Sequence, residues 1–266
     1  MTLFPSAWYR GEIVPTESLP IQPVWEPNEP YGVGVFTTTR SFFARQRLAF
    51  WDLHRIRLVA SQAILGFSDN PWALLDRTTF ARWHESLGED ACVRINMLSA
   101  SIRPYMIWAV AKPLPSTPTP TKLAISNEPA TEERRLKRIG QEWRQRAEDE
   151  ADANGVWDVV AIGSDGLVRD GSKANILYRV GPKWFSPPTD FRLLPGVVRA
   201  ALLDHGLVEE RPVTVEELLA ADEVVCTNSV RGIVPIHEVE GRQFAPGEAT
   251  KKLQEWFEKA AVAHAE

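Results

Sequence analysis

Residues 170–175, with the sequence DGSKAN, end an apolar run and carry the clearest information about the architecture of this chain. Two later segments end apolar runs in the same way, LPGVVR at residues 194–199 and TNSVRG at residues 227–232. A helix is predicted to begin after the Pro-Gly pair of the second segment, where the first backbone N–H groups have no partner inside the helix. With the helix dipole behind them, the N–H groups of Val197 and Val198 form a candidate phosphate site, although an ordinary helix entry has the same pattern.

Strands and helices follow one another around these segments without a regular repeat. Apolar runs bounded by turn residues predict strands at residues 31–40, 92–98, 105–111, 122–126, 157–162, 167–170, 175–179, 223–227 and 232–236. Amphipathic or charged stretches predict helices at residues 51–66, 71–87, 131–153, 196–205, 215–220 and 249–264. In the first of these helices, one apolar stripe is predicted, formed by Leu53, Ile56, Val59, Ala63 and Ile64. The irregular mixture favours an α+β fold over a doubly wound sheet.

One segment near the middle separates two parts of the chain. Residues 114–121, LPSTPTPT, have no periodicity, and each proline favours extended geometry in the residue before it. We interpret this segment as an interdomain linker. The expected domains are a smaller N-terminal α/β domain at residues 1–113 and a larger C-terminal domain with a strand-rich core at residues 122–266.

Composition excludes several classes of partner. The formal net charge of −5 comes from interspersed acidic and basic residues, so no basic surface for nucleic acid is expected. No apolar run approaches the ~18 residues that a membrane span requires, and the first residues do not have the pattern of a signal peptide. The two cysteines, Cys92 and Cys226, lie in apolar runs and are predicted to be buried thiols. This cysteine usage fits a reducing compartment, so we expect a cytoplasmic protein.

The sequence gives little support to a metal site, a hydrolase or a dinucleotide-binding site. The five histidines are scattered without short ligand spacing, so no metal site is expected. A hydrolase nucleophile elbow is absent because no Gly-x-Ser-x-Gly occurs. The glycines of residues 32–34, GVG, do not have the third glycine of a dinucleotide fingerprint. We interpret them as strand glycines that allow close packing.

Taken in order, the segments resemble the class IV family of pyridoxal 5'-phosphate enzymes, which includes branched-chain and D-amino-acid aminotransferases and aminodeoxychorismate lyase. The resemblance covers nearly the whole chain. Residues 32–40, GVGVFTTTR, are similar to the first core strand of the family, and residues 54–58, HRIRL, to its His-x-x-Arg-Leu helix. The resemblance implies a two-domain fold of the D-amino-acid aminotransferase type, known as fold type IV, and a homodimer.

The resemblance also assigns roles to residues. It implies that Lys137 carries the cofactor and that Asp170 faces its pyridine nitrogen. It implies a phosphate site formed by the Arg57 side chain, the backbone amides of Val197 and Val198, and the Ser229 hydroxyl, with His54 in support. Taken alone, Lys137 lies in a run of charged residues that fits a solvated helix surface. Only its spacing to the other motifs makes it the candidate cofactor lysine.

This sequence departs from the family pattern at several positions. Asp170 stands where the family has glutamate, which shortens the reach to the ring by one methylene, and Val198 replaces a common threonine. The loop at residues 99–105 is short and does not contain the Arg-Gly-Tyr element that binds a substrate carboxylate in many members. Arg103 and Arg231, with Tyr105, are the candidate replacements, and surface charges are the alternative for the two arginines.

The form of the first core strand favours one reaction. Phe36-Thr37-Thr38 is typical of the lyases, whereas the aminotransferases more often have Phe-Glu-Thr, so Thr38 joins Lys137 and Asp170 as a candidate catalytic residue. The expected activity is formation of 4-aminobenzoate and pyruvate from aminodeoxychorismate, a step of folate biosynthesis. The alternatives are an amino-acid aminotransferase of the branched-chain or D-amino-acid type and a non-catalytic relative.

Overall fold

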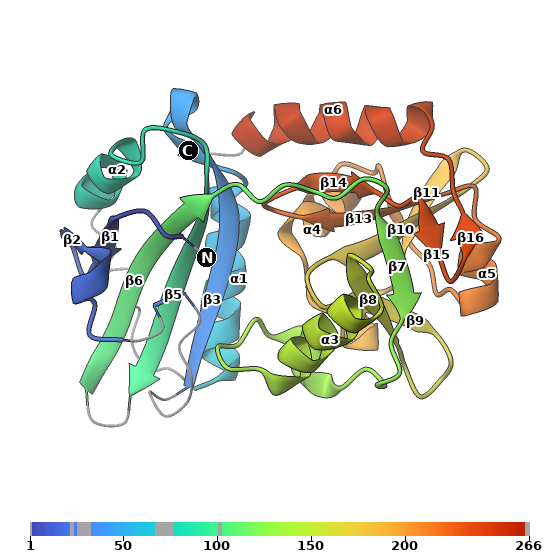
Figure 1. The fold of residues 1–266 in the computed structure, drawn as a ribbon, viewed down its shortest axis with the longest axis horizontal. Coiled ribbons are helices and arrows are strands. Elements are labelled where there is room, and N and C mark those ends of the chain that lie inside the picture. The colour runs from blue at the N-terminus through green and yellow to red at the C-terminus, as the bar shows by residue number, and fades with distance from the viewer. Residues whose placement is uncertain (1, 22–23, 26–32, 67–76, 101–102, 264–266) are drawn as a thin grey trace. The chain divides into compact units, whose positions relative to one another are not determined.

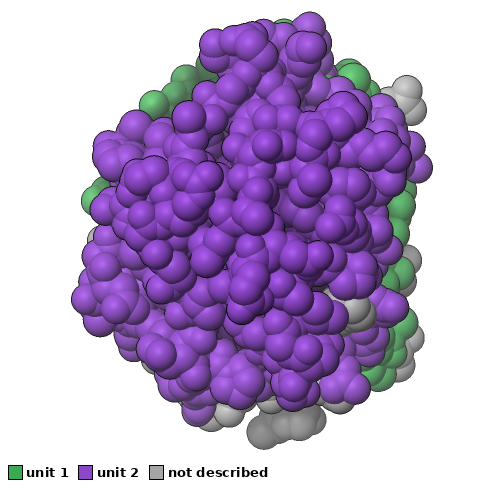
Figure 2. Space-filling model, turned by 90° about the vertical axis from the view of Figure 1, so that its right-hand side faces the viewer, with its two compact units in different colours: residues 1–115, 136–140, 260–266 green, residues 116–135, 141–259 purple. Residues whose placement is uncertain are grey.

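The computed structural model describes residues 2–21, 24–25, 33–66, 77–100 and 103–263. These residues form two compact units (Figures 1 and 2). Unit 1 comprises Met1–Pro115, Leu136–Gly140 and Ala260–Glu266, and unit 2 comprises Ser116–Arg135 and Gln141–Lys259. The chain first passes from one unit to the other between Pro115 and Ser116, inside the segment interpreted as a linker. The short return of Leu136–Gly140 to unit 1 was not expected from the sequence.

Unit 1 is built on one antiparallel sheet of six strands in the order β2-β1-β6-β5-β3-β4 (Figure 1). The strands are β1 (Ser6–Tyr9), β2 (Glu12–Pro15), β3 (Val33–Phe42), β4 (Arg47–Leu48), β5 (Ala91–Ala100) and β6 (Arg103–Pro113). The helices are α1 (Trp51–Ile64) and α2 (Arg77–Glu85). The hairpin predicted from residues 92–98 and 105–111 is confirmed as β5 and β6. The part of the predicted helix 71–87 that precedes Arg77 lies outside the described residues.

Helix α1 contacts the sheet through a face that differs from the predicted one. Ile56, Val59 and Ile64 of the expected apolar stripe are exposed, at 61%, 45% and 69%. The buried face consists of His54, Leu58, Ser61 and Gln62. The predicted stripe was wrong: Thr37 of β3 presents its hydroxyl to His54 and Arg57, so polar side chains of the helix face this part of the sheet.

The helix predicted for residues 131–153 was wrong over its first half. Only α3 (Glu142–Ala153) is α-helical, and a short 3-10 helix, η4 (Glu132–Arg135), precedes it. Between them, Arg138 forms an isolated β-bridge with Val35 of β3, and residues 139–140 form a turn. Gly140 lies in the left-handed region, with a φ of 72°. Pairing with a distant strand therefore overrides the helical preference of a locally charged run.

Unit 2 contains two five-stranded sheets, ordered β12-β11-β10-β13-β14 and β16-β15-β7-β8-β9. The first sheet consists of β10 (Asn175–Val180), β11 (Lys183–Ser186), β12 (Glu209–Glu210), β13 (Glu223–Asn228) and β14 (Gly232–Pro235). The second consists of β7 (Lys122–Ile125), β8 (Asp158–Ile162), β9 (Val168–Gly171), β15 (Glu238–Val239) and β16 (Arg242–Gln243). One apolar core joins the two sheets, because Leu123, Val160 and Val168 pack in the same cluster as Ile176 and Val224.

The remaining helices of the chain are α4 (Val197–Asp204), α5 (Val215–Leu219) and α6 (Glu248–Ala263), of which α6 ends in unit 1. Together the two units give an α+β fold with a strand-rich second unit, so the predicted fold class is confirmed. Cys92 and Cys226 are buried free thiols, as predicted. Among the described residues, no helix combines the length and apolar character needed to cross a membrane.

Candidate active site

Three side chains of unit 1 form a hydrogen-bonded cluster between α1 and β3. Nη2 of Arg57 donates to Oγ1 of Thr37 at 2.8 Å, and the same oxygen lies 2.5 Å from Nδ1 of His54. His54 and Thr37 are fully buried. An arginine can only donate, so Thr37 accepts from Arg57 and its own proton is available to the histidine nitrogen.

The electrostatics of this cluster keep positive charge on Arg57 alone. Burial lowers the pKa of His54 well below its ordinary value, and the nearby charges of Arg57 and Lys137 lower it further. Burial also lowers the pKa of Arg57 to about 10, which still leaves the guanidinium charged at neutral pH. A neutral histidine therefore supports a charged arginine, as anion binding requires.

Lys137 lies at the edge of strand β3. The backbone N–H of Phe36 donates to the Lys137 carbonyl at 3.0 Å, and the Ile139 N–H donates to the Gly34 carbonyl at the same distance. The Lys137 Nζ lies 4.9 Å from the centre of the Phe36 ring. Lys137 is thus held by backbone pairing and an aromatic face, not on the solvated helix surface that its charged neighbours suggested.

Thr38 and Thr37 point to opposite sides of β3, because successive residues of a strand alternate. Thr37 faces α1 and contacts His54 and Arg57. Thr38 is half-buried and shares the face of Phe36. The sequence had singled out Thr38 as the catalytic threonine, and the hydroxyl that the structure brings to Arg57 is that of Thr37.

Asp170 lies on β9 of unit 2 and is buried. Its Oδ2 accepts a hydrogen bond of 3.0 Å from the Leu194 backbone N–H, and its Oδ1 is buried without a hydrogen-bond partner among the described residues. Burial raises the pKa of Asp170 to about 6, the Arg134 charge lowers it, and the Asp158 charge raises it. Asp170 therefore has one fixed oxygen and one oxygen with unused acceptor capacity.

Asn175 ties this carboxylate to the start of α4 and was missed by the sequence analysis. Its Nδ2 donates to the Leu194 carbonyl at 2.9 Å, so the backbone of Leu194 is held at its N–H by Asp170 and at its C=O by Asn175. The Asn175 side chain also occupies the place that a Cβ on Gly196 would take. A glycine is therefore required at this N-cap. The polar asparagine at the end of the DGSKAN segment was the sequence signal that could have identified Asn175.

Helix α4 begins as predicted, directly after Gly196. No side-chain hydrogen bond caps it, and the Ala200 N–H donates to the Gly196 carbonyl at 2.8 Å. Val197 and Val198 are its first two residues and are buried. Ser229 is also buried and directly follows β13. Their backbone amides and hydroxyl fit the anion-binding groups expected of a phosphate site.

Asp158, on β8, is a second buried carboxylate, to which the sequence analysis assigned no role. It accepts hydrogen bonds from the Val159 N–H, the Ser172 N–H, the Ser172 hydroxyl and the Lys173 N–H, at 2.6–3.2 Å. Burial raises its pKa, while the hydrogen bonds and the Lys173 charge oppose that effect. Asp158 therefore fixes the turn that follows Asp170.

The structure describes the side chain of one of the three candidate substrate-binding residues, Arg231. Arg103 and Tyr105 lie on β6, and their side chains fall outside the described part of the structure. Arg231 donates from Nη2 to the Ser116 carbonyl at 3.3 Å and lies 5.9 Å from the Trp157 ring centre. Its position is thus defined by a carbonyl and an aromatic ring, and no described contact assigns it a substrate.

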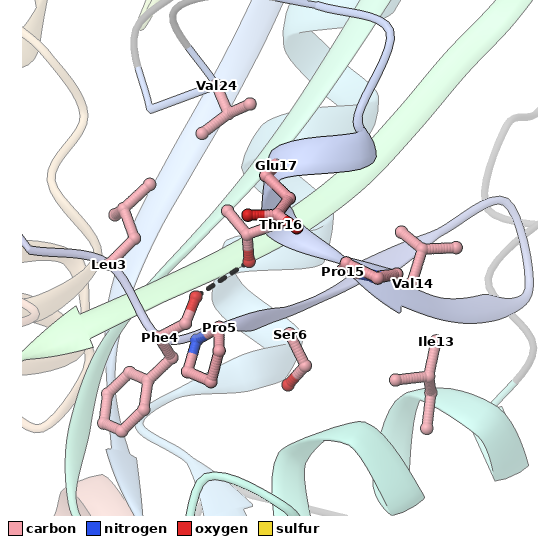
Figure 3. Close-up of a pocket in the computed structure, with 10 residues that line it drawn as sticks. All are labelled: Leu3, Phe4, Pro5, Ser6, Ile13, Val14, Pro15, Thr16, Glu17 and Val24. Carbon is pink, nitrogen blue, oxygen red and sulfur yellow. Dashed lines mark hydrogen bonds between the residues drawn. The ribbon is translucent and has the colours of Figure 1, made fainter.

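An open groove of about 750 Å³ lies on unit 1, away from these residues in sequence (Figure 3). It is lined by residues of β1, β2 and the segments beside them: Leu3, Phe4, Pro5, Ser6, Ile13, Val14, Pro15, Thr16, Glu17 and Val24. None of the candidate catalytic or cofactor-binding residues lines it. Among the described residues, no group of three or more histidine, cysteine, aspartate or glutamate side chains could hold a metal ion.

The sequence pattern of a family described as "Amino-transferase class IV" matches residues 34–239, which is most of the chain. This chain belongs to the class IV aminotransferase family. Its members are enzymes that use pyridoxal 5'-phosphate, so the expected enzyme class and cofactor are confirmed.

Relatives with different names match different shares of the chain. The aminodeoxychorismate lyase of Bacillus subtilis is 26% identical over 259 residues, covering 86% of each chain. The Aquifex aeolicus protein named "Probable branched-chain-amino-acid aminotransferase" is 35% identical over 120 residues, covering 42% of this chain and only 39% of its own length. The branched-chain aminotransferase structure from Thermoproteus uzoniensis has a TM-score of 0.82 at 24% identity, covering 97% and 95% of the two chains, which supports the fold.

The described residues fit the cofactor within each unit. Unit 1 supplies an amine at Lys137 and a supported guanidinium at Arg57. Unit 2 supplies uncapped amides at the start of α4 and, at Asp170 Oδ1, a buried acceptor with no other hydrogen bond. These groups match the aldehyde, phosphate and pyridine nitrogen that pyridoxal phosphate presents.

Proposed function

We propose that this chain is a 4-amino-4-deoxychorismate lyase that forms 4-aminobenzoate and pyruvate. The observation that carries the proposal is the length of the match to the Bacillus subtilis lyase, 86% of both chains. The match to the Aquifex aeolicus protein has a higher sequence identity, 35%, but covers only 39% of that protein. Threonine at position 37, where aminotransferases more often have glutamate, supports the same choice.

Each candidate residue has a proposed task. Arg57, the α4 amides of Val197 and Val198, and the Ser229 hydroxyl bind the cofactor phosphate. Asp170 accepts a hydrogen bond from the pyridine nitrogen and keeps it charged. When bound, the cofactor withdraws electrons from the bond next to the substrate amine.

Lys137 has two tasks in this proposal. Its amine would hold the cofactor, and, once freed by the substrate, it would accept the proton from C4 of the substrate. The electrons of that C–H bond form a ring double bond, and the C3–O bond to the enolpyruvyl group breaks. The departing enolate gains a proton to become pyruvate, and the remaining ring is 4-aminobenzoate. Aromatisation favours this direction.

The alternative is an amino-acid aminotransferase of the branched-chain or D-amino-acid type. The 35% identity to the Aquifex aeolicus protein favours it. In that reaction Lys137 would move the proton that it took from the amino acid, water would release the substrate as a 2-oxo acid, and the amino group would stay with the cofactor for the second substrate. A non-catalytic relative is disfavoured because Lys137, Arg57 and Ser229 are all present.

Further parts of the proposal concern the context of the enzyme. We place the reaction in folate biosynthesis and the protein in the cytoplasm. We expect a homodimer, and Arg103, Tyr105 and Arg231 as candidates for binding the substrate carboxylates. Sedimentation of the purified protein tests the dimer directly.

A product assay tests the reaction. Purified protein with bound cofactor is given 4-amino-4-deoxychorismate, and 4-aminobenzoate and pyruvate are measured separately over time. We expect the two products in equal amounts, and Lys137→Ala should form neither. If pyruvate stays absent while an amino donor and 2-oxoglutarate react, the aminotransferase is the correct assignment.

A further inference from the structure

Arg134 is a buried cation of unit 2 that none of the expected roles includes. It lies in η4, and only 3% of its side chain is exposed. Nη1 donates to the Asp170 carbonyl at 3.3 Å, and the guanidinium carbon lies 4.2 Å from the Trp143 ring centre on α3. Burying a charge is costly unless a partner compensates it, so this placement requires a specific counter-charge.

The counter-charge is the Asp170 side chain. Nη1 of Arg134 lies 3.6 Å from Oδ1 of Asp170, which is ion-pair distance but too long for a good hydrogen bond. The hydrogen bond to the Asp170 carbonyl and the Trp143 ring also hold the guanidinium. Arg134 therefore supplies charge to the carboxylate while Oδ1 keeps its acceptor capacity.

The charged groups that face Asp170 come from separate elements. Arg134 approaches from η4, and Asp158 approaches from β8, while the Leu194 N–H binds the other oxygen. Burial and Asp158 both favour the protonated acid, and Arg134 opposes them. Arg169, the neighbour of Asp170 on β9, instead pairs with Asp165. Arg134 is thus the cation that the described residues bring to this carboxylate.

We propose that Arg134 is a positioning residue that keeps Asp170 ionised and leaves its Oδ1 available to the pyridine nitrogen of the cofactor. The proposal rests on the role proposed for Asp170 and does not depend on the choice between lyase and aminotransferase. It gives a reason why aspartate serves where the family has glutamate. The Asp170 side chain is buried, and a buried arginine beside it offsets the cost of its charge.

The first test measures the Asp170 carboxyl in the full-length, cofactor-free protein. Its carbon resonance, assigned with Asp170→Asn, is followed against pH in ¹³C-aspartate-labelled wild type, Arg134→Met and Arg169→Met. An opposite charge at this distance lowers the pKa of an acid by about 1 to 3 units, so Arg134→Met should raise the midpoint by that amount. Arg169→Met removes the same charge next to Asp170 in the sequence and should leave the midpoint within about 0.5 unit of wild type, because its partner is Asp165.

The second test uses the protein loaded with cofactor labelled with ¹⁵N in the ring. At pH 8 the ring nitrogen should be protonated in wild type and Arg169→Met, and deprotonated to a larger extent in Arg134→Met. Arg134→Lys, which keeps the charge, should lie closer to wild type. If Arg134→Met does not fold, the ring-nitrogen resonance of Arg134→Lys is compared with that of wild type in its place.

Several outcomes would overturn the proposal. An Asp170 midpoint that is the same in wild type and Arg134→Met would show that the arginine only supports the fold. A protonated Asp170 in wild type at pH 8 would also overturn the proposal, because Arg134 would then not keep the carboxyl ionised. Because the carboxyl titration needs neither cofactor nor substrate, its failure is distinguishable from failure of the lyase assay in the wild-type enzyme.

Discussion

The Ile139 backbone N–H donates a hydrogen bond of 3.0 Å to the Gly34 carbonyl, and an ideal Cβ on Gly34 would lie 2.8 Å from Cδ1 of Ile139. The same Cβ would lie 2.8 Å from the Met97 carbonyl oxygen, which is backbone and cannot rotate away. The bare glycine therefore lets the segment Leu136–Gly140 lie against β3. This contact places Lys137 at the strand edge.

A side chain at position 34 should displace the lysine segment. Gly34→Val is expected to destabilise the protein by about 1 to 3 kcal/mol, the usual cost of overpacking, and to weaken cofactor binding as well. Urea unfolding and the absorbance of bound cofactor measure the two effects. In Gly34→Ala, a second change of Ile139→Val removes Cδ1 and should recover part of the loss. If Gly34→Ala loses as much stability and cofactor binding with Ile139→Val as without it, this explanation is contradicted.

Thr37 should matter for cofactor affinity more than its neighbours do. Thr37→Val removes the oxygen that Arg57 and His54 share, and leaving buried polar groups unpaired costs about 1 to 3 kcal/mol, or about 5-fold to 160-fold in the cofactor dissociation constant. Thr39→Val is the matched control, because Thr39 lies on the same face of β3 as Thr37 and, among the described residues, its hydroxyl bonds to the backbone carbonyls of Arg40 and Ala49. It should lower stability without the affinity loss. Similar dissociation constants for the two variants would count against the Arg57 cluster.

Asp170 should make stability depend on pH in a defined direction. Its folded pKa of about 6 lies above the ordinary value of 3.8, so the folded state binds the extra proton between these values. The contribution of Asp170 to stability is therefore greatest below pH 3.8 and falls as pH rises to 6, by about 3 kcal/mol at most.

Asp170→Asn removes this titration. In urea unfolding of the cofactor-free proteins from pH 4 to pH 8, the stability of wild type relative to Asp170→Asn should fall with pH and then level off above pH 6. Taking the difference cancels the titration of other groups. A difference that is constant with pH, or that rises, would show that the pKa of Asp170 is not raised by folding.

Asp158 should be among the most sensitive positions in unit 2. Its carboxylate accepts three hydrogen bonds from Ser172 and Lys173 in the turn after Asp170 and a fourth from the Val159 N–H, and Asp158→Asn would put an amide donor against those donors. We expect a loss of about 3 kcal/mol in the free energy of unfolding. Ser172→Ala removes only one hydroxyl and should cost about 1 kcal/mol. If Asp158→Asn unfolds at the same urea concentration as Ser172→Ala, the turn does not depend on the carboxylate.

The sequence was sufficient for features that local chemistry determines. The strand that ends at Gly171 and the helix that begins after Gly196 follow from an apolar run and a Pro-Gly pair, and both are present. The DGSKAN segment also contains Asp170 and Asn175, whose side chains hold the Leu194 peptide. The resemblance to the class IV family could be recognised because these signals occur in a fixed order.

Features that depend on distant partners could not be predicted in this way. The environment of Lys137 is set by β3, about a hundred residues earlier, so its charged neighbours predicted a helix that does not form. Arg134 pairs with a residue 36 positions away, and Thr37 with residues 17 and 20 positions away. Such pairs have no periodicity in the sequence, and only the folded chain reveals them.

The most direct measurement is to locate the cofactor on the chain. Borohydride reduction fixes pyridoxal phosphate to the lysine that carries it, and the modified peptide is then identified by mass spectrometry after digestion. The cofactor should be found on the peptide that contains Lys137, and Lys137→Ala should leave no modified peptide and no bleaching of the yellow protein. Attachment to Lys112 or Lys173 instead, or a wild-type protein that does not bind the added cofactor, would contradict the assignment of this site.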